Sequence, residues 1–198
     1  MRCIEWRRYK PVGQKRYAIG ELNRSHLMRF YVIEPEVAGG WGDNIIVDRS
    51  VEPVRVEHLH YEFDGWLGDD LLTTHPVYIC TEQVAAALQA GRFSGVELAD
   101  VEVSRSSQFL ELHPSRVLPV FRWLKVTGKA ERDDFGLRDG HLVVSDRAMS
   151  CLKSFSLKQA RVCTVAEFVW DPGKHTDQLF ADAKRMADEL RRQRGLKK

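Results

Sequence analysis

Two histidines one residue apart, His58 and His60, have the spacing in this sequence that best suits metal binding. Alternate residues of a β-strand project from the same face, so both imidazoles would point the same way. An aspartate from Asp64 to Asp70 would then supply a third ligand, and the site would suit a metal-dependent hydrolase. The chain has seven histidines, however, so this spacing also arises by chance. We predict no metal and no other cofactor, and the hydrolase stays an alternative.

Other motif-like stretches favour structure over catalysis. Asp134-Phe135-Gly136 has the letters of the kinase magnesium motif, but the Gly-rich loop and the H-R-D motif of a kinase are missing. It predicts a turn capped by aspartate. Thr81 and Ser145 precede short helical patterns and are typical helix N-caps, with no G-x-S-x-G elbow around either. We therefore predict no catalytic residue and do not expect an enzyme.

The four cysteines and the composition indicate an ordinary globular protein. No C-x-x-C pair occurs, so the cysteines predict neither a disulfide framework nor a metal knuckle. With 198 residues, 43% of them hydrophobic, residues 1–198 fit a single domain. The N-terminus lacks a signal-peptide pattern, and no apolar run is long enough to span a membrane. We expect a cytoplasmic protein without a membrane partner.

Strand-like patterns dominate the first half of the chain. Residues 27–33 are apolar and aromatic, and a glycine-rich turn at 39–43 leads into residues 44–47. Residues 54–63 alternate in polarity, with a change of face near His58 that predicts either a bulge or a strand covered on both sides. Residues 118–126 form a further strand, and Pro119 places it at a sheet edge or marks its start.

A strand, a capped short helix and a second strand occur twice, at residues 75–104 and 141–165. The first unit has a strand at 77–80, a helix at 83–90 and a strand at 96–103; the second has 142–144, 147–155 and 159–165. This is the pattern of a diverged repeat. Residues 176–194 carry an apolar stripe that predicts a long C-terminal helix. The fold class is therefore α+β, with a mixed or antiparallel sheet, short helices and this long helix.

Charge is divided unevenly along the sequence. Residues 34–82 hold eleven carboxylates and two arginines, a local net charge of −9, without a lysine. The chain as a whole carries +2, because both ends are basic. Such a molecule has faces of opposite sign, and these select its partners.

The acidic stretch also contains aromatic residues of the type that anchor protein interfaces, namely Tyr61, Phe63 and Trp66. Carboxylates around such anchors suit the capture of a basic protein surface. The function predicted from these features is a non-enzymatic protein-binding module with an acidic face. The candidate partner-binding residues are Glu57, Glu62, Asp64, Trp66, Asp69 and Asp70.

The second half adds a resemblance. Residues 142–152, Leu-Val-Val-Ser-Asp-Arg-Ala-Met-Ser-Cys-Leu, with Leu157 and the strand to Val165, resemble a pattern in bacterial immunity proteins of polymorphic-toxin systems. A related group has paired C-x-x-C-G motifs, which this sequence lacks, so a zinc ribbon is not implied. The resemblance implies an inhibitor that neutralises a cognate toxin, and it carries over no catalytic residue. An acidic face fits such a role, because nuclease toxins tend to be basic.

The basic N-terminus offers a different alternative. Trp6, Tyr9 and Tyr17 lie among arginines there, which is the composition of a nucleic-acid footprint. The acidic stretch that follows would repel a phosphate backbone, so we expect a protein partner, such as a basic toxin domain, in preference to nucleic acid.

Overall fold

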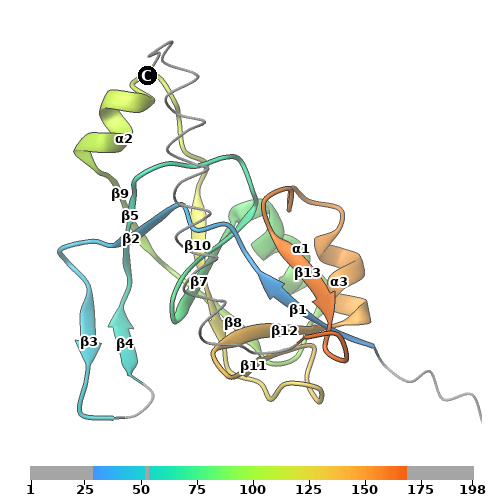
Figure 1. Cartoon of the computed structure of the whole chain (residues 1–198). Helices are drawn as coiled ribbons and strands as arrows, with labels where there is room; N and C mark the ends of the chain where they lie inside the picture. The colour runs from blue at the N-terminus through green and yellow to red at the C-terminus, as the bar shows by residue number, and fades with distance from the viewer. Residues whose placement is uncertain (1–28, 52–53, 169–198) are drawn as a thin grey trace, which may run out of the picture.

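The computed structural model describes residues 29–51 and 54–168. Strands predominate, and the three helices in these ranges are short (Figure 1). The elements in chain order are β1 (Phe30–Glu34), β2 (Gly39–Trp41), β3 (Ile46–Asp48), β4 (Arg55–His58), β5 (His60–Phe63), β6 (Leu71–Thr74), β7 (Val77–Thr81), α1 (Glu82–Gly91), β8 (Val96–Ala99), β9 (Glu102–Arg105), α2 (Ser107–Leu112), β10 (Phe121–Val126), β11 (Phe135–Arg138), β12 (His141–Ser145), α3 (Asp146–Leu152) and β13 (Arg161–Thr164). The predicted helix at 176–194 and the basic N-terminus lie outside the described residues.

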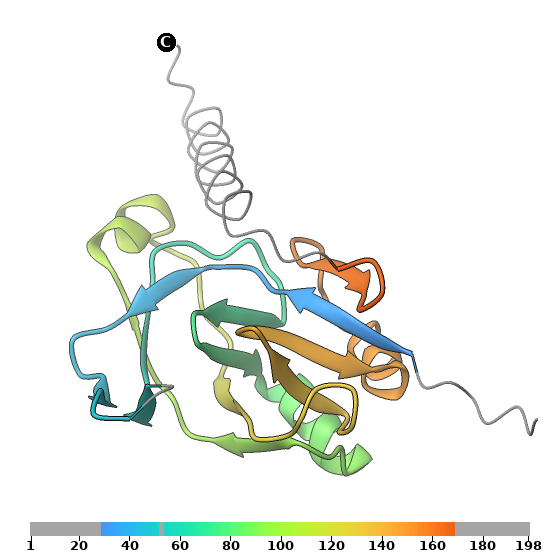
Figure 2. The same ribbon diagram turned by 60° about the horizontal axis from the view of Figure 1, so that its bottom comes forward.

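Two four-stranded antiparallel sheets have the same plan. One has the order β6-β7-β10-β8 and the other β11-β12-β1-β13. In each, a hairpin leads into a short helix and then into an edge strand, and residues 64 positions apart take matching places. The third strand comes from elsewhere in the chain, since β10 completes the first sheet and β1 the second. Figure 2 shows β1 beside the β11–β12 hairpin. Common ancestry of the two units stays a prediction.

The last residue of each hairpin is also the N-cap of the helix that follows, so each hairpin ends where a helix begins. Ser145 accepts a hydrogen bond from the backbone N–H of Ala148 and so caps α3, as its position before the helix predicts. Thr81 occupies the N-cap of α1, but its hydroxyl donates to Asp70 instead, at 3.0 Å. The hydroxyl of Ser145 also donates to the matching carboxylate, Asp134, at 2.6 Å. In both units the aspartate immediately before the hairpin thus binds the N-cap residue that follows the hairpin.

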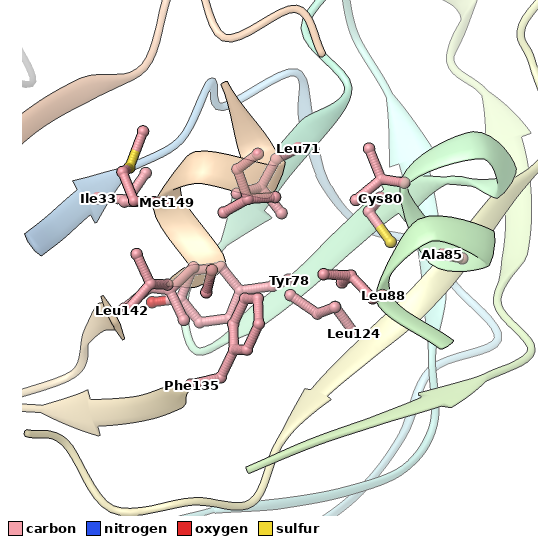
Figure 3. Close-up of a cluster of buried hydrophobic side chains, with 14 residues drawn as sticks. Ile33, Leu71, Tyr78, Cys80, Ala85, Leu88, Leu124, Phe135, Leu142 and Met149 are labelled. Atoms are coloured by element: carbon pink, nitrogen blue, oxygen red, sulfur yellow. The ribbon is translucent and has the colours of Figure 1, made fainter. Parts of the chain in front are cut away.

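A core of buried side chains lies between these two sheets and the helices α1 and α3. Figure 3 shows Tyr78, Phe135 and Leu124 pointing towards one another from β7, β11 and β10. Cys80 belongs to the same core, and burial raises the pKa of its thiol to about 12. The free thiol is therefore a small buried hydrophobe, as its apolar neighbours in the sequence indicate.

Two insertions build a second core on the other face of the β6-β7-β10-β8 sheet. Residues 35–70 separate β1 from β6, and residues 100–120 separate β8 from β10. They supply the mixed sheet β2-β5-β9, the hairpin β3–β4 and the helix α2. In Figure 1 α2 stands beyond β9 at one end of the molecule, and β3–β4 projects from its side.

Several sequence-based boundaries were wrong. The strand at 54–63 divides at Leu59, because this side chain is buried in the second core while β4 pairs with β3 and β5 pairs with β2 and β9. The strand at 96–103 divides in the same way into β8 and β9. Phe135 starts β11 and is fully buried, so the predicted turn lies earlier, at residues 129–133. The helix α2 and the strand β6 were not predicted.

The position of β10 decides between the two predictions for Pro119. This strand lies between β7 and β8, so it is not at an edge. It begins at Phe121, two residues beyond the proline. An inner strand has a neighbour on each side, so every backbone N–H faces a hydrogen-bond partner. A proline has no N–H to donate, which is why the strand starts only after it.

Candidate protein-binding surface

Asp69, one of the predicted contact residues, is buried with an exposed fraction of 0%. Its carboxylate accepts hydrogen bonds from the backbone N–H groups of Lys158, Gln159 and Ala160 at 2.7, 2.8 and 3.1 Å. It therefore fixes the turn before β13 and has no exposed atom to offer to a partner. The prediction of a contact role for Asp69 was wrong, because its buried carboxylate is the hydrogen-bond acceptor of three backbone amides.

Asp70 is also engaged within the fold. One carboxylate oxygen accepts from the Thr81 hydroxyl, and the other accepts from the Ser156 backbone N–H at 2.7 Å. Asp134, its match in the other unit, accepts from the Ser94 backbone N–H at 3.0 Å. Each aspartate thus holds the segment that follows the helix of the other unit. This pairing gives Asp70 a structural role in the scaffold.

A third carboxylate, Glu36, holds the loop at 64–70, which contains Asp69 and Asp70. It is buried, and it accepts from the backbone N–H of Leu67 at 2.5 Å and of Asp69 at 3.1 Å. Burial raises the pKa of Glu36, while the two N–H groups and Arg116 act in the opposite direction. The backbone of the loop at 64–70 is therefore fixed from beneath.

Trp66 lies in this loop and is partly exposed. Its indole N–H donates to the backbone oxygen of Asp69 at 2.9 Å, and its ring packs edge-on against Phe121 with centroids 5.9 Å apart. The guanidinium of Arg116 lies over the ring, 4.8 Å from the centroid. The indole is thus held from three sides, by a hydrogen bond, an aromatic contact and a cation–π contact.

Three aliphatic side chains around Trp66 are exposed. Val37 is 52% exposed, Leu67 47% and Val117 85%. Leu67 is next to Trp66 in the loop, Val37 follows Glu36, which binds the Leu67 amide, and Val117 follows Arg116, which lies over Trp66. Asp64 is exposed at the start of the same loop. We call Val37, Asp64, Trp66, Leu67, Arg116 and Val117 the Trp66 surface.

The Trp66 surface forms where the two insertions meet. Val37 and the loop at 64–70 belong to the first insertion, and Arg116 and Val117 to the second. Of these residues only Asp64 and Trp66 were predicted. For Val117 the signal was the apolar run Val117-Leu118-Pro119-Val120, which precedes β10 and is not itself a strand. An apolar run outside an element is a reason to suspect an interaction surface.

Glu57 and Glu62 lie elsewhere, on β4 and β5. Glu57 is exposed and pairs with Arg55 of the same strand at 3.2 Å. Glu62 accepts from the Ser104 hydroxyl at 3.2 Å across the β5–β9 pair. The two other aromatic residues proposed as exposed anchors, Tyr61 and Phe63, have exposed fractions of 0% and belong to the second core. The six predicted residues therefore do not form one patch.

The two histidines bind protein groups rather than sharing an open site. The Asn44 backbone N–H donates to Nδ1 of His60 at 3.0 Å, so Nε2 carries the proton and lies 2.8 Å from the Ser104 hydroxyl. His58 pairs with Glu102, its Nε2 2.9 Å from the carboxylate, and the other oxygen of Glu102 lies 4.0 Å from Nε2 of His60. Within residues 29–51 and 54–168, no three His, Cys, Asp or Glu side chains are grouped as a metal ion requires. Hydrogen bonds occupy both nitrogens of His60, so the described residues give the His58/His60 hydrolase no metal site, and that alternative has no structural support.

Glu102 provides a prediction about pH. Hydrogen bonds from His58 and Asn44 hold the pKa of Glu102 below the ordinary value of a glutamate. Its contribution to stability is therefore present above the ordinary carboxyl pKa and is lost as the pH falls through the lowered one. Replacing His58 with alanine should raise the pKa of Glu102, measured by NMR titration of the carboxyl carbon. His75→Ala, at an exposed remote histidine, is the control. An unchanged Glu102 pKa in His58→Ala would contradict the assignment.

Comparison with known proteins does not assign a family. No protein-family model matches the sequence, and no curated protein matches it significantly. In the described portion of the chain no helix is long and apolar enough to cross a membrane.

Proposed function

We propose that the chain is a non-enzymatic protein-binding module, and that it acts as an immunity protein that neutralises a bacterial toxin. The observation that carries this proposal is the Trp66 surface, where a fixed indole and an arginine are joined by exposed aliphatic residues adjacent in sequence. Tryptophan and arginine are enriched among the residues that dominate binding energy. The resemblance of residues 142–165 to immunity proteins supports the choice of a toxin as partner.

The rigidity of the surface supports a binding role. Burying the Glu36 carboxylate has a desolvation cost, and it fixes a loop whose Leu67 side chain points into solvent. A loop already in its bound conformation loses less entropy on association, so a larger share of the contact energy appears as affinity. In this proposal the toxin buries Leu67 and Val117, and the exposed acids Asp64 and Glu57 steer a basic toxin towards them.

Sequencing the neighbouring genes and titration calorimetry with any toxin domain that they encode test the proposal. The double variant Leu67→Asp/Val117→Asp should lose at least about thirtyfold in affinity, the effect of one or two dominant residues. The matched control is Leu137→Asp on β11, also an exposed leucine, which should stay within about twofold of the unmodified protein. A second arm, Asp64→Lys/Glu57→Lys, should slow association at low salt.

Two results would overturn the proposal. Unchanged affinity in Leu67→Asp/Val117→Asp would place the contact elsewhere on the molecule. Absence of any complex with the adjacent toxin would remove the immunity role. Urea denaturation of each variant shows whether the fold is retained, and it should be, because both substituted side chains are on the surface.

A further inference from the structure

Within the described residues, the two four-stranded sheets end in matching edge strands, β8 in the first unit and β13 in the second. The Thr127 N–H donates to the carbonyl oxygen of Gly95, so the backbone of Gly95 faces the inner strand β10. Backbone groups alternate in direction along a strand, so those of Val96 and Leu98 face outward. Val162 on β13 has the position of Leu98 at the 64-residue spacing. The two outer edges can therefore be compared group by group.

The chain itself closes the outer edge of β13. The Ala160 N–H donates to the Asp69 carboxylate at 3.1 Å, and the Thr164 N–H donates to the Glu167 carboxylate at 3.0 Å. The carbonyl oxygen of Thr164 accepts from the N–H groups of Glu167 and Phe168. These bonds occupy the outward groups at both ends of the strand, so another strand cannot pair along it.

The outer edge of β8 lacks both closures. Asp133 has the position of Asp69, but its carboxylate accepts from the Lys129 N–H at 2.8 Å. Val103 has the position of Glu167 and carries no carboxylate. In the described part of the chain no group bonds to the outward backbone of β8, and Figure 2 shows this strand, in light green, along the margin of the molecule. Its outward N–H and C=O groups are available to an added strand.

A groove beside this edge indicates which side chains an added strand would need. The groove lies between α1 and β8 and has a volume of 140 Å³. Four of the side chains that line it are apolar, namely Leu88, Phe93, Val96 and Leu98. Every second side chain of an added strand would project onto this side of the sheet. An aliphatic residue opposite Leu98 would therefore extend the apolar surface.

The two ends of the groove differ in charge. At the end of β8, Arg122 binds Asp100 at 2.7 Å and Glu82 at 3.9 Å, which leaves one negative charge in excess. At the start of β8, the exposed Arg92 lines the groove. A second copy of this chain in the opposite direction would bring its acidic end to the basic end of the first, and the reverse contact would repeat.

We propose that two copies of this chain associate through their β8 edges about a two-fold axis, which joins their four-stranded sheets into one continuous sheet. The strands pair antiparallel, with Leu98 opposite the same residue of the second copy. In this register Glu97 lies opposite Ala99, and Val96 lies opposite Asp100, so no like charges face each other. The interface uses no residue of the Trp66 surface, and it is independent of the immunity role.

Sedimentation velocity of the full chain tests the proposal. The unmodified protein should form a dimer whose share rises with concentration. Leu98→Pro should weaken dimerisation by about tenfold or more, because proline removes the N–H at the centre of the pair. The fold should tolerate this change, since the N–H of Leu98 does not bond to β10. Val162→Pro, at the matching position of the closed edge, is the control and should dimerise like the unmodified protein.

A second variant and a local measurement complete the test. Leu98→Lys places two lysines opposite each other across the axis, and its aliphatic stem keeps part of the packing of Leu98. It replaces Leu98→Pro if urea denaturation shows that the proline variant is unfolded. Hydrogen exchange of the amides of Val96 and Leu98 should slow as the protein concentration rises. Exchange at Ala160 and Thr164, which bond within the chain, should not depend on concentration.

A monomer at every concentration up to about 0.1 mM would overturn the proposal. A dimer that a folded Leu98→Lys variant does not weaken would also overturn it, as would equal weakening by Val162→Pro. Exchange at Val96 and Leu98 that is independent of concentration would place the interface on another surface.

Discussion

Asp69→Ala is expected to lower the free energy of unfolding by about 3–5 kcal/mol. The substitution removes a buried carboxylate and leaves the amides of Lys158, Gln159 and Ala160 without their acceptor. Buried N–H groups without partners each carry a desolvation penalty, and the turn before β13 would have to move to hydrate them. Urea denaturation followed by circular dichroism measures the loss.

The exposed Asp64 of the same loop is the matched control for Asp69. Asp64→Ala should change stability by less than about 0.5 kcal/mol. Hydrogen exchange adds a local measurement, because the amides of Lys158 to Ala160 should exchange faster in Asp69→Ala. A loss below about 1 kcal/mol together with unchanged exchange would show that the carboxylate does not hold this turn.

Phe63→Ala should also cost about 3–5 kcal/mol. The ring has an exposed fraction of 0%, and it contacts Tyr61, Phe109 and Phe121 at centroid distances of 4.8, 6.3 and 5.1 Å. Its removal leaves a cavity at the point where β5, α2 and β10 meet. The second core holds the loop of the Trp66 surface in place, so partner affinity should fall together with stability.

Leu110→Ala on α2, an exposed leucine beside the buried Phe109, is the control for Phe63→Ala and should cost less than about 0.5 kcal/mol. Thermal unfolding of both variants gives the comparison. Equal stability of Phe63→Ala and Leu110→Ala would mean that the second core contributes little to the native state.

Local patterns in the sequence predicted the elements that depend on local signals. The hydroxyls of Thr81 and Ser145 mark the starts of α1 and α3, and the apolar strands before them are β7 and β12. The prediction of one strand at 54–63 failed at Leu59. The change of face near His58 marked the register shift in β4, but polarity alternates on both sides of Leu59 and does not show that two sheets share the stretch. Pairing with β3, β2 and β9 decides the matter, and that information lies elsewhere in the chain.

The acidic residues also show that local sequence does not reveal contacts with distant parts of the chain. Asp64 and Asp69 have the same chemistry and lie five positions apart, yet one is exposed and the other buried. The difference comes from amides 89 to 91 residues further along the chain. Composition therefore predicted the acidic stretch, but only the fold shows which of its carboxylates can meet a partner.

The strand β1 precedes the first unit but completes the sheet of the second, while β10 precedes the second unit and completes the sheet of the first. This arrangement has a consequence for folding in the cell. Tyr31 pairs with Val144, so the first described strand finds its place only after more than a hundred further residues have been made. Pairings at such sequence separation slow folding, because loop entropy is lost before contacts form. During synthesis the β6–β7 hairpin and α1 can form early, while β1 waits with unpaired edges until β12 leaves the ribosome. Among the described strands, β1 is thus the one most dependent on protection while the chain is being made.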